Sequence, residues 1–330
     1  MIILFWIAVF IVALAVMVKG ADWLLGSAEK IGLAAGLSPF IVGVTIVGLG
    51  TSLPELVSSL VAVFKDANEM VAANAIGSNV ANILLVVGAA TLIGRGAVLS
   101  KSLIDLDLPL LAISTVIFLG VAWDRAITFP EVLILLFTYG IYLLYTFVHE
   151  HDEPHSPESV ALSTPLARVK RKRTTRTSVR PKITTKDFVM LGVGIIALVI
   201  GAKYVVDAVI ALADIFDIAT GVIAISAVAL GTSLPELLVS VKAALRGQPE
   251  VALGNIFGSN VFNALVVVGI PGLFGTLALD DATYFIGLPA LALVTLLFVI
   301  SGISRRIHVW EGALYLVAYI LFTAKLFSIF

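Results

Sequence analysis

The sequence contains no cysteine and little charge. None of the 330 residues is Cys, and Asp, Glu, Lys and Arg together make up only 13%. The absence of thiols excludes disulfides, thiolate metal sites and cysteine-based catalysis. A water-soluble domain is roughly half apolar and about a quarter charged, whereas this chain is 60% hydrophobic, with a mean hydropathy of +1.09. These values predict a membrane protein.

The apolar residues form long runs rather than the alternation of membrane β-strands, which favours helices over an outer-membrane barrel. Ten runs approach or exceed the roughly 20 residues that a spanning helix needs. They cover residues 1–18, 37–64, 70–93, 103–122, 129–148, 188–206, 218–245, 251–279, 284–303 and 307–327. We therefore expect an all-α polytopic membrane protein with ten transmembrane helices.

One polar stretch, residues 149–187, separates the fifth run from the sixth and holds nine of the chain's 21 Lys and Arg residues. The positive-inside rule assigns such a loop to the cytoplasm. Five spans on each side then put both termini outside the cytoplasm, in a multi-pass protein of the cell (inner or plasma) membrane. Basic runs also bind nucleic acid, but beside membrane spans this one is typical of an orientation signal and flexible linker, and no nucleic-acid partner is expected.

Two motifs occur twice, 181 residues apart. Gly-Thr-Ser-Leu-Pro-Glu-Leu at 50–56 recurs at 231–237. A second pattern, Asn74 with Gly-Ser-Asn-Val at 77–80 and Asn82, recurs as Asn255, 258–261 and Asn263. Because each half contains an odd number of predicted spans, the halves have opposite orientations, an architecture typical of secondary transporters with a midplane site.

The duplication predicts the domain organisation. We expect a first five-helix repeat over 1–148 with its motif region at about 37–93, a cytoplasmic basic linker over 149–187, and a second five-helix repeat over 188–330 with its motif region at about 218–275. The two repeats form one inverted-topology pair.

Glu55 and Glu236 are the only two of the 22 carboxylates that fall deep inside predicted spans. A charge at the bilayer centre costs at least about 2.5–3.5 kcal/mol by insertion scales. No Lys or Arg lies at matching depth to form an ion pair. A bound cation is the simplest stabilising partner, because carboxylates are hard oxygen ligands for Ca²⁺, Mg²⁺ or Na⁺.

Hydroxyl groups accompany each glutamate. Thr51 and Ser52 precede Glu55 by four and three residues, so their side chains lie on or beside its helix face. Pro54 lacks an N–H and clashes with the carbonyl four residues back, so it is expected to free the Gly50 carbonyl and to loosen its neighbours, including that of Thr51. The second motif repeats this with Thr232, Ser233, Pro235 and Gly231. Two facing motifs would form an all-oxygen site.

The second pattern adds amides and hydroxyls from the following helix. Ser78 and Asn82 are four residues apart and share a face, as do Ser259 and Asn263. Small residues allow close helix approach in membranes, which is the role expected of Gly77 and Gly258. A lone intramembrane Ser or Thr usually serves packing, but here the whole constellation is duplicated.

Both motifs together closely resemble the alpha repeats of the sodium/calcium exchanger family, within the calcium/cation antiporter superfamily, and the chain looks like a compact prokaryotic member. The resemblance implies exchange of Ca²⁺ against Na⁺ by alternating access. It implies that the long first and sixth helices slide across the core to switch the open side. It implies no cofactor and no enzymatic activity; the partners are inorganic cations and the lipid bilayer, with no obligate protein partner evident.

The resemblance also implies ligands for each ion. The calcium ligands it implies are Glu55, Glu236, Thr51 and Thr232, the threonines through their carbonyls. The sodium ligands it implies are the same four residues together with Ser52, Ser233, Ser78, Ser259 and the carbonyls of Gly48 and Ala229. Asn82, Asn263, Pro54 and Pro235 are expected to line the site.

One departure from the family concerns Asn82 and Asn263, because members commonly carry an Asp at one of these positions. The site therefore has two carboxylates, which still neutralise one Ca²⁺. The departure leaves two hypotheses for the coupling ion: it is Na⁺, or it is H⁺ carried by the glutamates. A passive channel and an intramembrane enzyme are further alternatives, but no HExxH motif or nucleophile elbow occurs.

Overall fold

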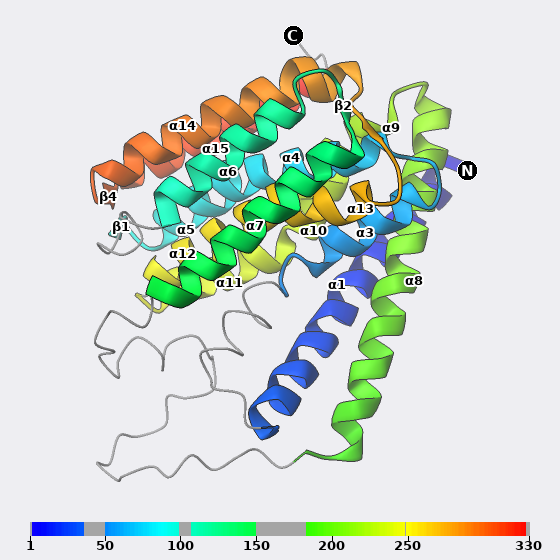
Figure 1. The fold of residues 1–330 in the computed structure, drawn as a ribbon, viewed down its shortest axis with the longest axis horizontal. Coiled ribbons are helices and arrows are strands. Elements are labelled where there is room, and N and C mark those ends of the chain that lie inside the picture. Colours follow the sequence, from blue (N-terminus) through cyan, green and yellow to red (C-terminus); the bar gives the residue numbers. More distant parts are fainter. Residues whose placement is uncertain (1, 36–49, 99–106, 150–182, 248, 328–330) are drawn as a thin grey trace.

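The computed structural model describes residues 2–35, 50–98, 107–149, 183–247 and 249–327, and most of them are helical (Figure 1). Within these ranges six helices are long and apolar enough to cross a membrane, and a seventh candidate is a pair bent by 42°. Three shorter apolar helices accompany them. The predicted helical membrane protein is thus confirmed in outline.

The first half of the chain begins with one long helix and continues with shorter ones. Its elements are α1 (Ile2–Ala34), α3 (Leu53–Val63), α4 (Glu69–Ala81), the π-helical turn η2 (Asn82–Val87), α5 (Gly88–Ile93), β1 (Ala97–Val98), α6 (Leu108–Val121), β2 (Ala126–Ile127) and α7 (Phe129–His149).

The second half follows the same order. Its elements are α8 (Thr185–Phe216), α9 (Thr220–Ile223), η5 (Ala224–Val228), α10 (Ala229–Thr232), α11 (Leu234–Leu245), α12 (Pro249–Phe262), η6 (Asn263–Val267), α13 (Gly269–Gly272), β3 (Leu277–Ala278), η7 (Thr283–Gly287), α14 (Leu288–Ile303), β4 (Arg306–Ile307) and α15 (Val309–Leu326). The π-helical turns η2 and η6 begin at Asn82 and Asn263, the equivalent residues of the two motifs.

Some predicted boundaries are wrong. The runs predicted to end at residues 18 and 206 continue as helix to Ala34 and Phe216. Charged side chains such as Lys19 interrupt the apolar run there without ending the helix, because they lie on an exposed face while Gly20 and Ala21 are buried. The run predicted over 251–279 ends as helix at Gly272, after Pro271. Residues 37–49 and 103–106, which belong to two other predicted spans, lie outside the described residues.

The all-α expectation is corrected by two short antiparallel ladders. β1 pairs with β4, and β2 pairs with β3. Two-residue strands are too short to show a hydrophobic period, so they could not be predicted from the sequence. Each ladder joins a loop of the first half to a loop of the second half, so backbone hydrogen bonds connect the two halves at two separate places.

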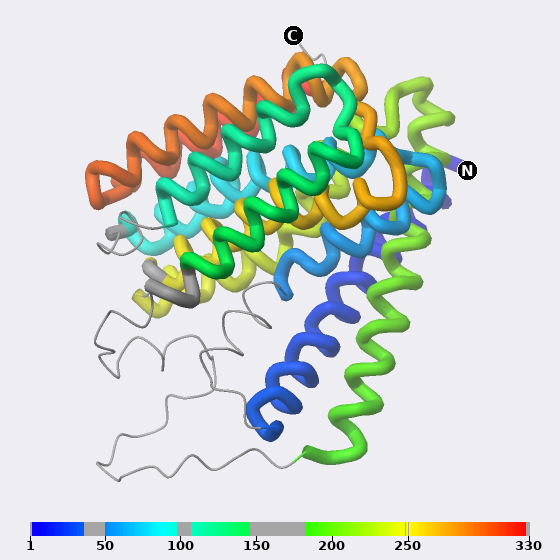
Figure 2. Tube along the Cα trace, in the orientation of Figure 1, coloured from blue at the N-terminus to red at the C-terminus, as the bar shows by residue number. Residues whose placement is uncertain are grey.

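Helices α1 and α8 form a closely packed pair that is tilted relative to the other helices (Figures 1 and 2). A Cβ atom on Gly20 would lie 2.5 Å from the Leu198 nitrogen, and one on Gly201 would lie 2.6 Å from the Met17 nitrogen. Such spacing requires glycine at both places. Near the other end of the pair, Lys30 Nζ lies 2.8 Å from Asp187 Oδ1. Close backbone packing and an ion pair thus join α1 to α8 at several points along their length.

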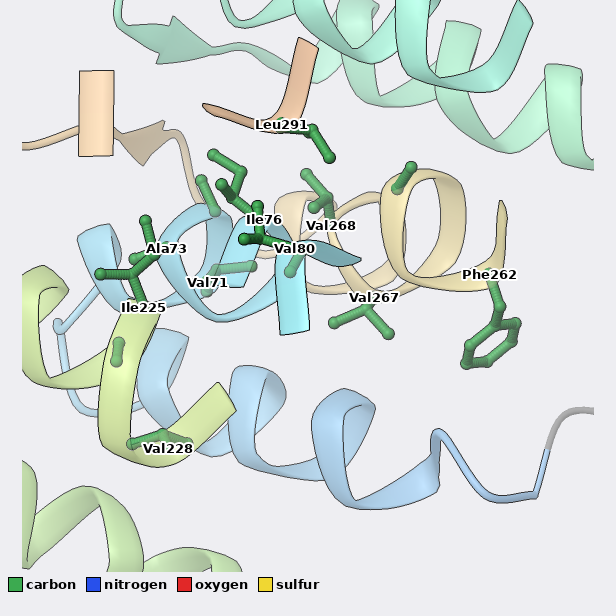
Figure 3. Close-up of a cluster of buried hydrophobic side chains, with 14 of the residues drawn as sticks. Val71, Ala73, Ile76, Val80, Ile225, Val228, Phe262, Val267, Val268 and Leu291 are labelled. Carbon is green, nitrogen blue, oxygen red and sulfur yellow. The ribbon is translucent and has the colours of Figure 1, made fainter. Parts of the chain in front are cut away.

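The centre of the molecule is formed by α4 with η2 and by α12 with η6. In the most apolar stretch of these two spans 78% of the residues are buried, compared with 11% for α1. Side chains of α4, η5, η6 and α14 meet in an apolar cluster that includes Ile76, Ile225, Val267 and Leu291 (Figure 3). Outward-facing positions of the peripheral helices carry exposed Leu, Ile and Phe side chains, as expected for helices in lipid.

Candidate cation site

The two Gly-Thr-Ser-Leu-Pro-Glu motifs lie where helices are interrupted. Thr51 and Ser52 precede α3, while Thr232 ends α10, which meets α11 at the 42° bend. The expectation that Pro54 frees the Gly50 carbonyl is wrong, because that carbonyl accepts a hydrogen bond from Leu53 N–H at 3.3 Å. The neighbouring Thr51 carbonyl accepts no backbone hydrogen bond from any described residue. The break therefore leaves the buried Thr51 carbonyl, and not that of Gly50, without a backbone partner, which fits the expectation that the neighbours of Gly50 are loosened.

Glu236 is fully buried and receives hydroxyl groups from both repeats. Ser52 Oγ donates to Glu236 Oε1 at 3.1 Å, and Ser259 Oγ donates to the same oxygen at 3.3 Å. The other oxygen, Oε2, has no partner among the described residues. The structure thus brings one motif glutamate together with the serine of the opposite motif, as two facing motifs require.

Glu55 is also fully buried, but its carboxylate is less engaged. Thr232 and Ser233 of the opposite motif lie beside it. Neither Glu55 oxygen accepts a hydrogen bond within the described part of the chain. Together with Glu236 Oε2, three carboxylate oxygens are therefore left open in the interior.

The second motif supplies further buried polar atoms. Ser78, Asn82, Ser259 and Asn263 are all fully buried. Among the described residues, Ser78 Oγ, Asn82 Oδ1 and both polar atoms of the Asn263 side chain have no partner. Because buried polar groups in proteins are almost always paired, these unpaired atoms are candidate ligands for an ion that the protein binds.

Asn74 and Asn255 connect neighbouring helices around the site. Both belong to the repeated pattern, but the pattern did not predict this role. Asn74 Nδ2 donates to Ser59 Oγ at 3.3 Å, and Asn255 Nδ2 donates to Ser240 Oγ at 3.4 Å. These bonds fasten α4 to α3 and α12 to α11 in the same way. Thr51 Oγ1 in turn donates to Asn255 Oδ1 at 3.5 Å, which links the first motif to the second half.

The outcome for the expected small-residue positions is mixed. An added Cβ on Gly77 would lie 2.2 Å from the Ile225 carbonyl oxygen, so the predicted close helix approach is confirmed there. The segment of the first half that would pack correspondingly on Gly258 lies within residues 36–49, outside the described residues, as does Gly48. The Ala229 carbonyl accepts hydrogen bonds from Ser233 N–H at 3.0 Å and from Thr232 Oγ1 at 3.3 Å.

The chemistry of these atoms suits a hard cation. In the described part of the chain no group of three or more His, Asp or Glu side chains could hold a metal ion. At this site the two glutamates stand with hydroxyl, amide and carbonyl oxygens. Such oxygen-only sets bind Ca²⁺ and Na⁺ rather than transition metals. The Pro54 and Pro235 rings are buried at the first turns of α3 and α11.

Comparison with known families decides where this chain belongs. The family described as "sodium/calcium exchanger protein" matches residues 5–148 and 186–327, which is most of the chain. The chain belongs to this family. The matched blocks contain both copies of each motif and leave out most of the basic stretch between them. The sodium/calcium exchanger family consists of transporters, not of enzymes.

Individual members of the family resemble this exchanger-family chain over nearly its whole length. It is 32% identical to the sodium/calcium exchanger MaX1 of Methanosarcina acetivorans over 97% of this chain and 98% of that protein. It is 32% identical to the putative antiporter CaxA of Alkalimonas amylolytica, over 96% and 97%. Solved structures of the sodium-calcium exchanger NCX_Mj superpose with a TM-score of 0.64 at 28% identity, covering 98% of this chain and 99% of that one.

Proposed function

We propose that the protein exchanges Ca²⁺ for Na⁺ across the cell membrane by alternating access at a site around Glu55 and Glu236. The observation that carries the proposal is the set of open, fully buried oxygen atoms contributed by both motifs. Charge and coordination argue for a cation: each ionised glutamate in the interior needs a compensating positive charge. One Ca²⁺ and several Na⁺ compete for the same oxygens, and this competition couples the two fluxes.

The proposed ligands are those implied by the family resemblance. Ca²⁺ binds Glu55, Glu236 and the carbonyls of Thr51 and Thr232. Na⁺ uses these residues together with Ser52, Ser233, Ser78, Ser259, Gly48 and Ala229, with Asn82 and Asn263 lining the site. The open Glu55, Ser78 and Ser233 oxygens support this set. An ion bound to the Ala229 carbonyl would have to replace the hydrogen bonds that this carbonyl accepts from Ser233 N–H and Thr232 Oγ1.

The proposed topology is ten transmembrane helices in two inverted repeats, residues 1–148 and 188–330, joined by a cytoplasmic linker. The ladders support it, because each joins loops that the order of the spans and the charge pattern assign to the same side. β1 and β4 bring together the loops with Arg95 and Arg305, which we assign to the cytoplasm. β2 and β3 join the loop at 123–128, assigned to the outside by the order of the spans, to the loop with Asp280 and Asp281, assigned there by its charge. Thiol labelling of single cysteines, introduced into this cysteine-free chain, tests the assignment.

The first test is the coupling ion. Na⁺-loaded proteoliposomes are expected to take up ⁴⁵Ca²⁺ when the outside is Na⁺-free, and to take up none when Na⁺ is equal on both sides at the same pH. A channel would pass Ca²⁺ without Na⁺ on the opposite side. Uptake driven by a pH gradient alone would overturn the proposal in favour of the second candidate, a proton-coupled cation antiporter in which glutamate protonation replaces Na⁺ binding.

Alternation is proposed to occur by sliding of the α1–α8 pair across the remaining helices. Glycine-mediated packing holds the pair together, and Leu14 of α1 contacts the second motif directly: a Cβ on Gly231 would lie 2.3 Å from its Cδ2. The pair meets α3 through Lys65, whose Nζ lies 2.5 Å from Asp207 Oδ1. Movement of the pair therefore changes what covers the site.

Cross-linking tests this movement. A short thiol-specific cross-linker between Lys30→Cys and Asp187→Cys, both within the α1–α8 pair, is expected to leave exchange intact. The same reagent between Lys65→Cys and Asp207→Cys, which ties α8 to the core, is expected to stop exchange until the link is cleaved. Loss of exchange in both double variants, or in neither, would contradict sliding of the pair as a unit.

A further inference from the structure

The two asparagines that follow Ser78 and Ser259 by one helical turn are held differently. Asn82 Nδ2 donates to Asn260 Oδ1 at 3.2 Å. Asn263, at the equivalent position, has no partner for either polar atom among the described residues. Both side chains are fully buried. Since the residue type is the same in both halves, the difference arises from their surroundings.

The surroundings differ at the crossing of α4 and α12, where Asn79 and Asn260 are the equivalent residues. Asn79 Nδ2 donates to the Asn260 backbone carbonyl at 3.0 Å, so Asn260 accepts from α4 twice, once through its backbone and once through its side chain. The reciprocal bonds are absent from the described residues, because Asn79 Oδ1 and Asn260 Nδ2 both lack partners. Two identical residues at a symmetric crossing are thus used asymmetrically.

This asymmetry matters because a side-chain amide has one end that accepts and one that donates. Cations bind only the oxygen end. With its nitrogen tied to Asn260, Asn82 keeps its oxygen open, and that oxygen is buried beside the face that carries Ser78. Without this bond the amide could turn over and present N–H groups to the ion.

We propose that Asn260 is a positioning residue: it holds the Asn82 amide so that Asn82 Oδ1 faces the transported cation, and it does so in only one of the two halves. The inference rests on the proposed exchange at this site. Asn260 itself does not touch the ion. Asn82 is a preset ligand, whereas neither polar atom of the Asn263 side chain is held by a described residue.

The matched variants Asn260→Ala and Asn79→Ala test this inference, because both remove an asparagine from the same crossing but only the first removes the bond to Asn82. In proteoliposomes, Asn260→Ala is expected to raise the Ca²⁺ KM about tenfold with the maximal rate within twofold, which matches the loss of one oriented ligand. Asn79→Ala is expected to keep KM within twofold. Asn260→Asp, whose carboxylate still accepts a hydrogen bond from Asn82, is expected to keep the low KM of the native protein.

A double variant adds a readout that a purely structural role would not produce. If Asn260 acts through Asn82, Asn82→Ala alone and Asn82→Ala with Asn260→Ala are expected to have the same KM. Additive increases in KM, equal increases in Asn260→Ala and Asn79→Ala, or a native KM in Asn260→Ala would each overturn the proposal. Asn260→Ser, too short to reach Asn82, carries the same expectation should the alanine variant not accumulate.

Failure of this inference is distinguishable from failure of the proposed function. If only the inference is wrong, Glu236→Gln still lacks exchange while Asn260→Ala and Asn79→Ala behave alike. If the proposed function is wrong, Glu236→Gln retains full Na⁺-dependent Ca²⁺ uptake, or the uptake requires no Na⁺.

Discussion

Replacing Glu236 with Gln is expected to abolish Na⁺-dependent Ca²⁺ uptake. The substitution keeps the shape of a fully buried side chain that accepts from Ser52 and Ser259 but removes its charge. Removing one partner from a buried charge pair costs about 3–5 kcal/mol, which corresponds to a loss of roughly two to three and a half orders of magnitude in affinity. Uptake of ⁴⁵Ca²⁺ over a range of Ca²⁺ concentrations measures it.

Glu55→Gln is expected to have the same effect, and Glu131→Gln serves as the control. Glu131 is also a membrane-helix glutamate, but it accepts from Thr128 N–H at 2.7 Å and Thr128 Oγ1 at 2.6 Å at the start of α7, away from the motifs. Its substitution is expected to leave the Ca²⁺ KM unchanged and to lower stability by about 1 kcal/mol as a weakened helix cap. Full exchange in Glu55→Gln or Glu236→Gln would refute the site.

Gly77→Ala is expected to produce the second large effect, through a single methyl group. The added Cβ would lie 2.2 Å from the Ile225 carbonyl oxygen and 2.7 Å from the Ala229 Cβ, so α4 and the η5–α10 segment must separate. Overpacking of this kind costs about 1–3 kcal/mol. Because Ser78 is the next residue, the displacement also moves a proposed ligand, and a loss of about tenfold or more in Ca²⁺ affinity is expected.

The matched control for this substitution is Gly140→Ala in α7. A Cβ added at Gly140 would have no described atom from another part of the structure within 4 Å. Alanine is also a better helix former than glycine by about 1 kcal/mol. Thermal unfolding of the purified variants and the Ca²⁺ KM together separate the two positions. Equal behaviour of Gly77→Ala and Gly140→Ala would mean that the close approach of α4 to η5 has no role in binding.

Much of the candidate site could be predicted from the sequence because its signal is local. A carboxylate within an apolar run is costly wherever it lies, so Glu55 and Glu236 were identifiable from hydropathy alone. The hydroxyls on the same helix face followed from spacing. Two facing motifs were expected to bring carboxylates and hydroxyls together, and the structure shows one such contact, between Ser52 Oγ and Glu236 Oε1.

The remaining features depend on contacts between distant segments. The helical extension of α1 to Ala34 is stabilised by packing on α8, which a hydropathy window cannot detect. The unequal use of Asn79 and Asn260 could not be predicted either, because the repeated motifs are identical at both positions and only the geometry of the crossing distinguishes them. Pattern identifies residue types, whereas the partner of each side-chain atom depends on three-dimensional packing.

The two ladders between the halves have a consequence for biogenesis. β1 has no β4 to pair with, and Ser52 has no Glu236 to bind, until the ribosome has added roughly 200 more residues, which takes on the order of 10–40 s at typical synthesis rates. During that interval Glu55 is present without any group of the second half, and the loop that carries β1 is unpaired. The nascent first half is therefore expected to be the stage at which membrane chaperones and quality-control proteases act on this chain.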